Sequence, residues 1–153
     1  MQSIKTGDMA PNFSLFDSSQ KKHTLLDYRA QWLVLFFYPK DDTPGCTVEA
    51  CQFKEHYAEI LAMNVQILGI NTDKPESHAR FINKFQLPFP LLSDQSGEVS
   101  QQYGSLFKLG FIKFCKRHSF IIDPKGQIAK IYRKVEPAKH SLQIITDLKE
   151  LMQ

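Results

Sequence analysis

Long hydrophobic runs are missing from this chain of 153 residues. The longest uninterrupted apolar stretch, WLVLFFY at residues 32–38, is far shorter than the ~20 residues that a membrane-spanning helix needs. Residues 1–15 contain no apolar core of the kind found in export signals. We therefore expect a soluble, cytoplasmic protein with no membrane partner.

Clusters of like charge and glycine-rich loops are also scarce. The formal net charge is only +3, and no run of five or more like charges occurs, so no basic arm for nucleic acid is present. None of the seven glycines belongs to a phosphate-cradling loop of the nucleotide-binding type. We expect neither a nucleic-acid partner nor a nucleotide cofactor.

Cysteine is rare, and the three cysteines are too few and too unevenly spaced to form a disulfide framework. Cys46 and Cys51 lie five positions apart, and in a reducing compartment we interpret such a pair as reactive rather than structural. A zinc site is the alternative, because Cys46-x4-Cys51-x4-His56 offers three ligands. Structural zinc takes four ligands at other spacings, so we expect no metal and no cofactor.

The apolar pattern predicts a single α/β domain over residues 1–153, because no linker, repeat or low-complexity segment interrupts it. The element order predicts a mixed central sheet flanked by helices, with an N-terminal β-hairpin extension. The expected elements are hairpin strands at 13–16 and 23–26, a buried strand at 32–38, a helix at 46–62, a strand at 65–70, a helix at 75–85, a strand at 89–92, a hairpin at 120–122 and 128–132, and a closing helix with the stripe Leu142, Ile145, Leu148 and Leu151 or Met152.

Cys46 follows the buried strand and begins the first long helix. Unpaired backbone N–H groups and the positive end of the helix dipole stabilise a thiolate at such a position. In the connecting segment, Pro39 ends the strand and Gly45 lets the backbone approach a ligand closely. The Thr43 hydroxyl can donate to one oxygen of a small substrate and accept from another. We therefore expect Cys46 to be a nucleophile.

The spacing Pro39-x-x-x-Thr43-x-x-Cys46, within FYPKDDTPGCTVEAC, resembles the active-site signature of peroxiredoxins and looks like that of the bacterioferritin-comigratory (BCP/PrxQ) subfamily. The similarity covers nearly the whole chain, through residues 7–15, 89–94 and 117–123. It implies a thioredoxin-like fold, and the reduction of hydrogen peroxide or an organic hydroperoxide by way of Cys46. It also implies that Arg117 is the active-site arginine, which favours the thiolate and stabilises charge on the peroxide oxygens, and that thioredoxin or a similar dithiol is the reductant.

Attack on a peroxide leaves Cys46 as a sulfenic acid, which a thiol must capture before further oxidation. Cys51 is the obvious resolving thiol, and members of the subfamily that this chain resembles use this position. On an ideal helix, however, an i,i+5 pair has Cα atoms roughly 8.5–9 Å apart, beyond the ~7 Å that a disulfide tolerates. We predict a helix through both cysteines in the reduced state, and a rearrangement of residues 46–51 on oxidation.

Several residues near this segment have two interpretations. Glu49 either orients Arg117 or is only a first-turn carboxylate favoured by the helix dipole. We interpret Cys115 as an apolar residue of a loop at 105–116, with a spare thiol as the alternative. Loop-solvating or surface positions are expected for Asp41, Asp42, His23, His56, His78 and His140, and strand alternation directs His118 away from Arg117.

A thiol–disulfide exchanger or chaperone-like binding module on the same fold is the alternative function. The Cys-x-x-Cys motif of exchangers is absent, and Phe111 and Phe114 make only a thin apolar patch. The apolar residues of the 105–116 connection either cover the site or form a dimer contact, so we expect a monomer or a weak homodimer.

Overall fold

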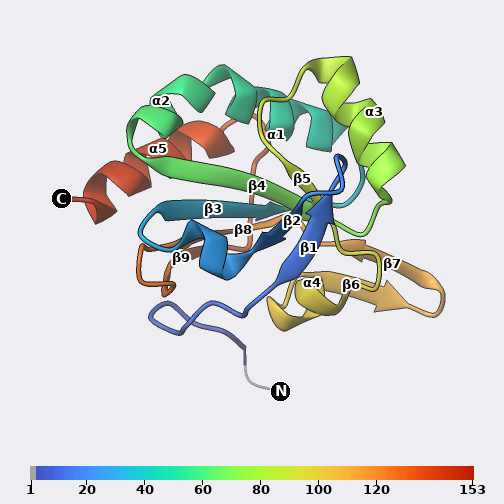
Figure 1. The fold of residues 1–153 in the computed structure, drawn as a ribbon, viewed down its shortest axis with the longest axis horizontal. Coiled ribbons are helices and arrows are strands. Elements are labelled where there is room, and N and C mark those ends of the chain that lie inside the picture. Colours follow the sequence, from blue (N-terminus) through green and yellow to red (C-terminus); the bar gives the residue numbers. More distant parts are fainter. Residues whose placement is uncertain (1–2) are drawn as a thin grey trace.

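A seven-stranded mixed sheet forms the centre of the protein in the computed structural model, which describes residues 3–153 (Figure 1). The strand order is β2-β1-β5-β4-β3-β8-β9. Strands β3, β4 and β5 run parallel, and the other neighbours are antiparallel. The strands are β1 (Ser14–Asp17), β2 (Lys22–Thr24), β3 (Trp32–Phe37), β4 (Val65–Asn71), β5 (Leu91–Ser93), β8 (His118–Ile122) and β9 (Ile128–Tyr132). The predicted mixed α/β fold is confirmed; of the proposed domain 1–153, residues 1 and 2 lie outside the described part.

Strand β3 lies inside the sheet because its apolar side chains are buried on both faces. It pairs in parallel with β4 and antiparallel with β8. Alternation along the strand sends Val34 and Phe36 into one core cluster and Leu33 and Leu35 into another. The run without polar residues at 32–38 is thus explained by a sheet that is covered on both sides.

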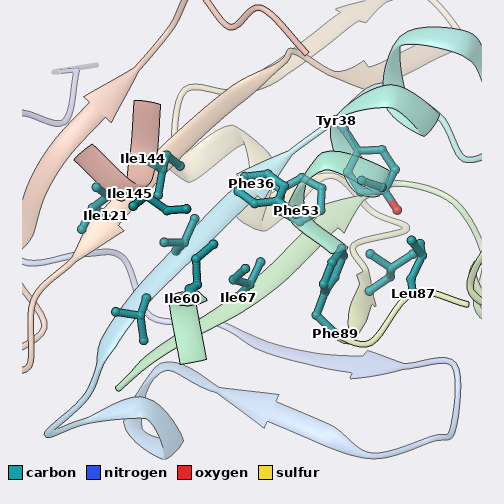
Figure 2. Close-up of a cluster of buried hydrophobic side chains, with 14 of the residues drawn as sticks. Phe36, Tyr38, Phe53, Ile60, Ile67, Leu87, Phe89, Ile121, Ile144 and Ile145 are labelled. Carbon is teal, nitrogen blue, oxygen red and sulfur yellow. The ribbon is translucent and has the colours of Figure 1, made fainter. Parts of the chain in front are cut away.

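One face of the sheet is covered by α1 (Pro44–Glu55), α2 (Tyr57–Ala62), α3 (Pro75–Phe85) and α5 (His140–Leu151). Figure 2 shows the core that they enclose, in which Phe53 packs beside Phe36 with ring centroids 4.9 Å apart. The opposite face is covered by the N-terminal segment, the 3-10 helix Leu25–Tyr28, α4 (Glu98–Gln102) and the end of β7 (Ile112–Cys115). Within residues 3–153, no helix is long and apolar enough to cross a membrane.

The N-terminal hairpin β1–β2 extends the sheet through the pairing of β1 with β5. Its second strand was expected at 23–26 but ends at Thr24, so that expectation was wrong at its end. The Thr24 hydroxyl accepts from the Asp27 N–H, and the Asp27 carboxylate accepts from the Thr24 N–H. This reciprocal cap starts the 3-10 helix and stops the strand.

The helix expected at 46–62 is two helices, because the chain turns at His56 between α1 and α2. The His56 ring lies 3.0 Å from the Gln52 carbonyl oxygen and 3.0 Å from the Ser141 hydroxyl, and these contacts hold the break. The stripe predicted for the closing helix is also partly wrong. Its buried apolar residues are Ile144, Ile145 and Leu148, whereas Leu142 is exposed.

The connection expected as a loop at 105–116 is a second, two-stranded sheet formed by β6 (Leu106–Leu109) and β7. The apolar residues here alternate with lysines, which is a strand pattern that the sequence-based assignment did not detect. Helix α4 precedes the hairpin and was also missed, since it has only five residues.

Surface positions were wrongly expected for His23, His78 and His140, which are all buried. Each ring has polar partners inside the protein: His23 contacts Asp17 and Tyr28, and His140 contacts the Ser119 hydroxyl at 2.8 Å. Buried polar groups are tolerated when they are hydrogen-bonded, and the sequence pattern did not reveal these pairings, local for His23 and distant for His140.

Candidate active site

The register between β3 and β8 brings the ends of two distant segments together. Phe37, the last residue of β3, lies opposite His118, the first residue of β8. Arg117 directly precedes β8, so it lies at the sheet edge from which residues 38–43 lead into α1. This segment, residues 38–43, is called the active-site loop below. An Nη2–H of Arg117 donates to the Cys46 sulfur over 3.4 Å.

Cys46 lies in the first turn of α1. Thr43 is the cap residue, with an extended backbone at φ −101° and ψ 156°, and Pro44 is the first helical residue. Proline suits this position because the first helical N–H has no acceptor within the helix. The other N–H groups of the first turn likewise lack acceptors within the helix, so they and the helix dipole favour negative charge beside Cys46. The Cys46 side chain is only 1% exposed.

Gly45 makes room for the arginine. A Cβ atom at this position would lie 2.9 Å from Nη2 of Arg117, closer than real Cβ contacts allow. The sequence suggested that Gly45 allows close approach of a ligand, and in the structure the group that approaches is the Arg117 guanidinium. Any side chain here displaces the arginine from the Cys46 sulfur.

Glu49 and Arg117 form an ion pair, with Glu49 Oε1 2.9 Å from Arg117 Nη1. Glu49 is one helical turn after Cys46 and its side chain is 1% exposed. Of the two interpretations left open by the sequence, the geometry supports the one in which Glu49 orients Arg117. The other carboxylate oxygen, Oε2, has no hydrogen-bond partner within residues 3–153.

Burial and neighbouring charge shift the pKa values of Glu49 and Arg117 in opposite directions. Burial raises the pKa of Glu49 to about 7, although the neighbouring Arg117 charge and hydrogen bond lower it. Burial lowers the pKa of Arg117, but the negative charges of Cys46 and Glu49 outweigh burial and raise it above its ordinary value. Arg117 is thus a fixed cation placed between a sulfur and a carboxyl group.

We expect Glu49→Gln to make the unfolding free energy of the protein depend less on pH. Between the ordinary glutamate pKa of 4.5 and about 7, folded wild type holds a proton on Glu49 that the unfolded chain has lost. Its unfolding free energy therefore falls as pH rises through this range, by on the order of 3 kcal/mol from this group. Glutamine has no such proton, so the stability difference between variant and wild type should change by this amount between about pH 5 and about pH 8 in urea titrations.

Glu55→Gln is the matched control, because Glu55 is an exposed carboxylate on the same helix. It should follow wild type at both pH values. The difference in unfolding free energy between Glu49→Gln and wild type could instead be the same at both pH values. That result would contradict the raised pKa of the Glu49 carboxyl group.

Thr43 and Pro39 lie in the active-site loop but differ in their surroundings. The Thr43 hydroxyl donates to the Lys40 carbonyl oxygen over 2.7 Å, so its proton is directed to the loop and its lone pairs are left to accept. This differs from the expectation that its hydroxyl donates to a substrate. Pro39 lies at the bend that follows Tyr38, at the other end of the loop.

Cys51 lies in α1 together with Cys46, and the helix is continuous through both residues. All three cysteines are free thiols. Cys115 is buried at the end of β7, with its sulfur 3.1 Å from the Ser100 hydroxyl. Burial raises the pKa of Cys115 to about 12, so its thiol stays protonated and unreactive at neutral pH. The structure therefore supports the interpretation of Cys115 as an unreactive residue, although it lies in a strand rather than in a loop.

Asp41 is the residue that sequence reasoning placed most wrongly. It was expected to be solvated, as Asp42 is, but its side chain is buried. Oδ2 lies 2.7 Å from His78 Nδ1 and accepts from the Ser77 hydroxyl at 2.8 Å, while Oδ1 accepts from the Tyr38 hydroxyl. Burial opposes ionisation of Asp41, but the hydrogen bonds and charge of His78, with its other donors, hold its pKa below the usual range.

This network fastens the active-site loop to the sheet and to α3. His78 Nε2 lies 3.1 Å from the Leu92 carbonyl oxygen, which can only accept, so Nε2 carries a proton. The backbone N–H of Asp41 donates to Asp73 over 2.8 Å. The loop that precedes Cys46 is thus held by contacts with α3, with Asn71 at the end of β4, and with Asp73 in the connection between them. No signal in the sequence distinguishes Asp41 from its exposed neighbour Asp42.

A zinc site of Cys46, Cys51 and His56 is not formed. Within residues 3–153, no three histidine, cysteine, aspartate or glutamate side chains are grouped closely enough to hold a metal ion. The His56 Nδ1 atom, as described above, is used at the break between α1 and α2.

Cys46 lies in the first turn of a helix that follows an inner strand, and Arg117 donates a hydrogen bond to its sulfur. This arrangement defines a thiol-based redox enzyme on a thioredoxin-like sheet. Residues 6–131 match the AhpC/TSA family, and the chain belongs to that family. The chain is 38% identical to Peroxiredoxin Bcp of Escherichia coli, over 98% of this chain and 99% of that protein. It is 36% identical to chloroplastic Peroxiredoxin Q of Triticum aestivum, over 95% of this chain and 68% of that one.

Comparison with solved structures also indicates similarity to PrxQ and Bcp proteins. A cysteine-to-serine variant of Xylella fastidiosa PrxQ superposes with a TM-score of 0.92 at 30% identity, covering 100% of both chains. Peroxidoxin BcpB of Mycobacterium tuberculosis superposes with a TM-score of 0.91 at 31% identity, covering 97% of this chain and 98% of that one. The predicted thioredoxin-like fold and the resemblance to the BCP/PrxQ peroxiredoxins are confirmed.

Proposed function

We propose that this protein is a thiol-dependent peroxidase that reduces hydrogen peroxide and organic hydroperoxides through Cys46. The observation that carries the proposal is the contact of Arg117 with the sulfur of a cysteine in the first turn of α1. Membership of the AhpC/TSA family supports it. The similar Xanthomonas campestris bacterioferritin comigratory protein is described as having alkyl peroxide reduction activity, which supports organic hydroperoxides as substrates.

In the first step, the Cys46 thiolate attacks one peroxide oxygen and the O–O bond breaks. The sulfur becomes a sulfenic acid, and the other oxygen leaves as hydroxide or alkoxide, which takes up from solvent the proton that the thiol released and becomes water or an alcohol. Arg117 stabilises the thiolate before attack and the charge that develops on the oxygens during it. Glu49 holds the guanidinium in place, Gly45 leaves room for it, and the lone pairs of Thr43 accept from the peroxide O–H. Pro39 and Pro44 set the two ends of the segment that encloses the substrate.

In the second step, the Cys51 sulfur attacks the sulfenic sulfur of Cys46, which releases water and forms a disulfide. Helical geometry opposes this step, because Cα atoms five residues apart lie roughly 8.5–9 Å from one another. The activated form of Cys46 therefore depends on a helix that must partly unwind before the disulfide can form.

Hydrogen exchange should detect this unwinding. One equivalent of hydrogen peroxide should produce a Cys46–Cys51 disulfide by peptide mapping, and amide exchange in the segment around residues 46–51 should accelerate strongly. The amides of α3 should stay protected and serve as the internal control. A mapped disulfide with unchanged protection in the first turns of α1 would contradict the rearrangement.

We also propose thioredoxin or a similar dithiol as the reductant of the disulfide, in a cytoplasmic compartment where thiols stay reduced. A thiol–disulfide exchanger is the alternative, and it is not favoured because the chain has no Cys-x-x-Cys and belongs to a peroxidase family. Peroxide consumption with thioredoxin should greatly exceed reduction of insulin disulfides by the same protein. The reverse ratio would overturn the proposed function.

A further inference from the structure

The β6–β7 hairpin has an apolar face that is largely exposed. Its strands pair Phe107 with Phe114 and Leu109 with Ile112, and cross-strand partners lie on the same face. Leu109 and Ile112 are 67% and 60% exposed, and Phe111 at the tip reaches 108%. Figure 1 shows the hairpin on the side of the sheet away from α1, α2, α3 and α5. This surface of five apolar residues is called the hairpin face below.

The hairpin is fixed at its base, so its direction is defined. Cys115 and Ser105 are buried, and the Lys116 N–H donates to the Ser105 carbonyl oxygen over 2.7 Å. At the tip, Gly110 has φ +60° at the first central position of a two-residue turn, where glycine is favoured. The tight turn leaves Phe111 projecting from the end. The hairpin is therefore a convex protrusion rather than a groove.

Three lysines add positive charge to this protrusion. Lys108 and Lys113 are cross-strand partners on the opposite face of the hairpin, and Lys116 follows at its base. Between Glu98 and Asp123 the chain has four basic residues, namely these three lysines and Arg117 of the candidate active site, and no acidic residue. The whole chain has 19 basic and 16 acidic residues, so the rest has 15 and 16 and a net charge of −1. The surplus of +3 thus comes from this segment.

We propose that the β6–β7 hairpin docks on the surface of anionic lipid bilayers. The hairpin face enters the boundary between headgroups and acyl chains, and the long lysine side chains reach the lipid phosphates. A second copy of the chain is a poorer occupant, because a symmetric contact through this segment, which has no acidic residue between Glu98 and Asp123, offers the lysines no negative partner. A protein partner with an apolar groove is a further alternative. Binding to such a partner would not require lipid.

The docked orientation brings the lipid surface close to the active site. Phe114 is only three residues before Arg117, a span of at most roughly 10 Å along an extended chain. The expectation of no membrane partner rested on uninterrupted apolar runs. A search for such runs misses the hairpin face, because apolar residues alternate with lysines along β6 and β7.

Vesicle sedimentation of the full chain tests the proposal. The protein should pellet with vesicles of phosphatidylcholine mixed with about one third phosphatidylglycerol, far less with phosphatidylcholine alone, and less as salt is raised. Lys108→Gln with Lys113→Gln should weaken the partition roughly thirty-fold, since each lysine near an anionic surface contributes about a five-fold factor. Phe111→Ser with Ile112→Ser should weaken it by on the order of ten-fold or more.

The matched controls are Lys21→Gln with Lys22→Gln, and Leu26→Ser, which change exposed lysines and an exposed leucine away from the hairpin. These variants should bind as wild type does, and circular dichroism should show that every variant is folded. Absence of pelleting by wild type, or equal losses in the controls, would overturn the proposal. So would a wild-type dimer in sedimentation velocity that Phe111→Ser abolishes, because the hairpin face would then be occupied by a second copy.

Discussion

Replacing Cys46 by serine is expected to abolish peroxide turnover, with a loss of at least about 10³-fold in the thioredoxin-coupled rate. A serine hydroxyl in this position stays protonated, because the Arg117 cation and the helix dipole together cannot compensate for its far weaker acidity. The fold should remain, since the change at a buried site replaces sulfur by a smaller atom. Peroxide consumption and thermal unfolding of the variant measure the two effects separately.

The other two cysteines are the controls for this experiment. Cys51→Ser should consume the first equivalent of peroxide at the wild-type rate and then show no thioredoxin-coupled turnover, because the Cys46 sulfenic acid has no resolving thiol and only further oxidation by excess peroxide remains. Cys115→Ser should keep nearly full turnover, since this thiol is buried and protonated. Turnover that survives in Cys46→Ser, or is lost in Cys115→Ser, would assign the chemistry to the wrong cysteine.

Asp41→Ala is expected to lower the unfolding free energy by about 3–5 kcal/mol, because it removes a buried charged acceptor that several buried donors share. The change leaves the ring of His78 and the hydroxyls of Tyr38 and Ser77 without their shared acceptor. Urea unfolding at neutral pH measures the loss. The neighbouring Asp42→Ala is the control, because the exposed Asp42–Lys84 pair should contribute at most about 1 kcal/mol.

The pH dependence of the Asp41 effect follows from its lowered pKa. A carboxyl group with a lowered folded pKa stabilises the protein above its ordinary pKa of 3.8, and this contribution is lost as pH falls through the lower folded value. The difference between Asp41→Ala and wild type should therefore shrink in strong acid. Equal stabilities of Asp41→Ala and Asp42→Ala at neutral pH would contradict a buried network at the active-site loop.

Local pattern was sufficient for most of the fold. The expected helix at 75–85 and strand at 128–132 have the bounds found in the structure, because each segment has a periodic apolar pattern and a clear start or stop residue. The errors lie where side chains from distant segments end an element. His56 breaks a long helix through Ser141 of α5, and Thr24 stops a strand through its cap. The β6–β7 hairpin was missed because lysines interrupt its apolar residues.

The position of Cys46 at the start of a helix is what the sequence by itself determined. A buried strand, a short loop with proline and glycine, and a helix whose first turn contains Cys46 are all local features. Local features decide backbone conformation and the direction of a helix dipole. The identity of Cys51 as the neighbouring thiol follows from the same stretch of chain.

The tertiary structure decided what surrounds Cys46. Arg117 reaches the Cys46 sulfur from 71 positions away because Phe37 pairs with His118, and a one-residue change of register would direct the arginine elsewhere. The burial of Asp41 beside His78, and the exposure of an apolar face on the β6–β7 hairpin, likewise depend on which segments pack together. Burial and pairing are properties of the packed chain, because neighbouring residues such as Asp41 and Asp42 have the same chemistry and differ only in what covers them.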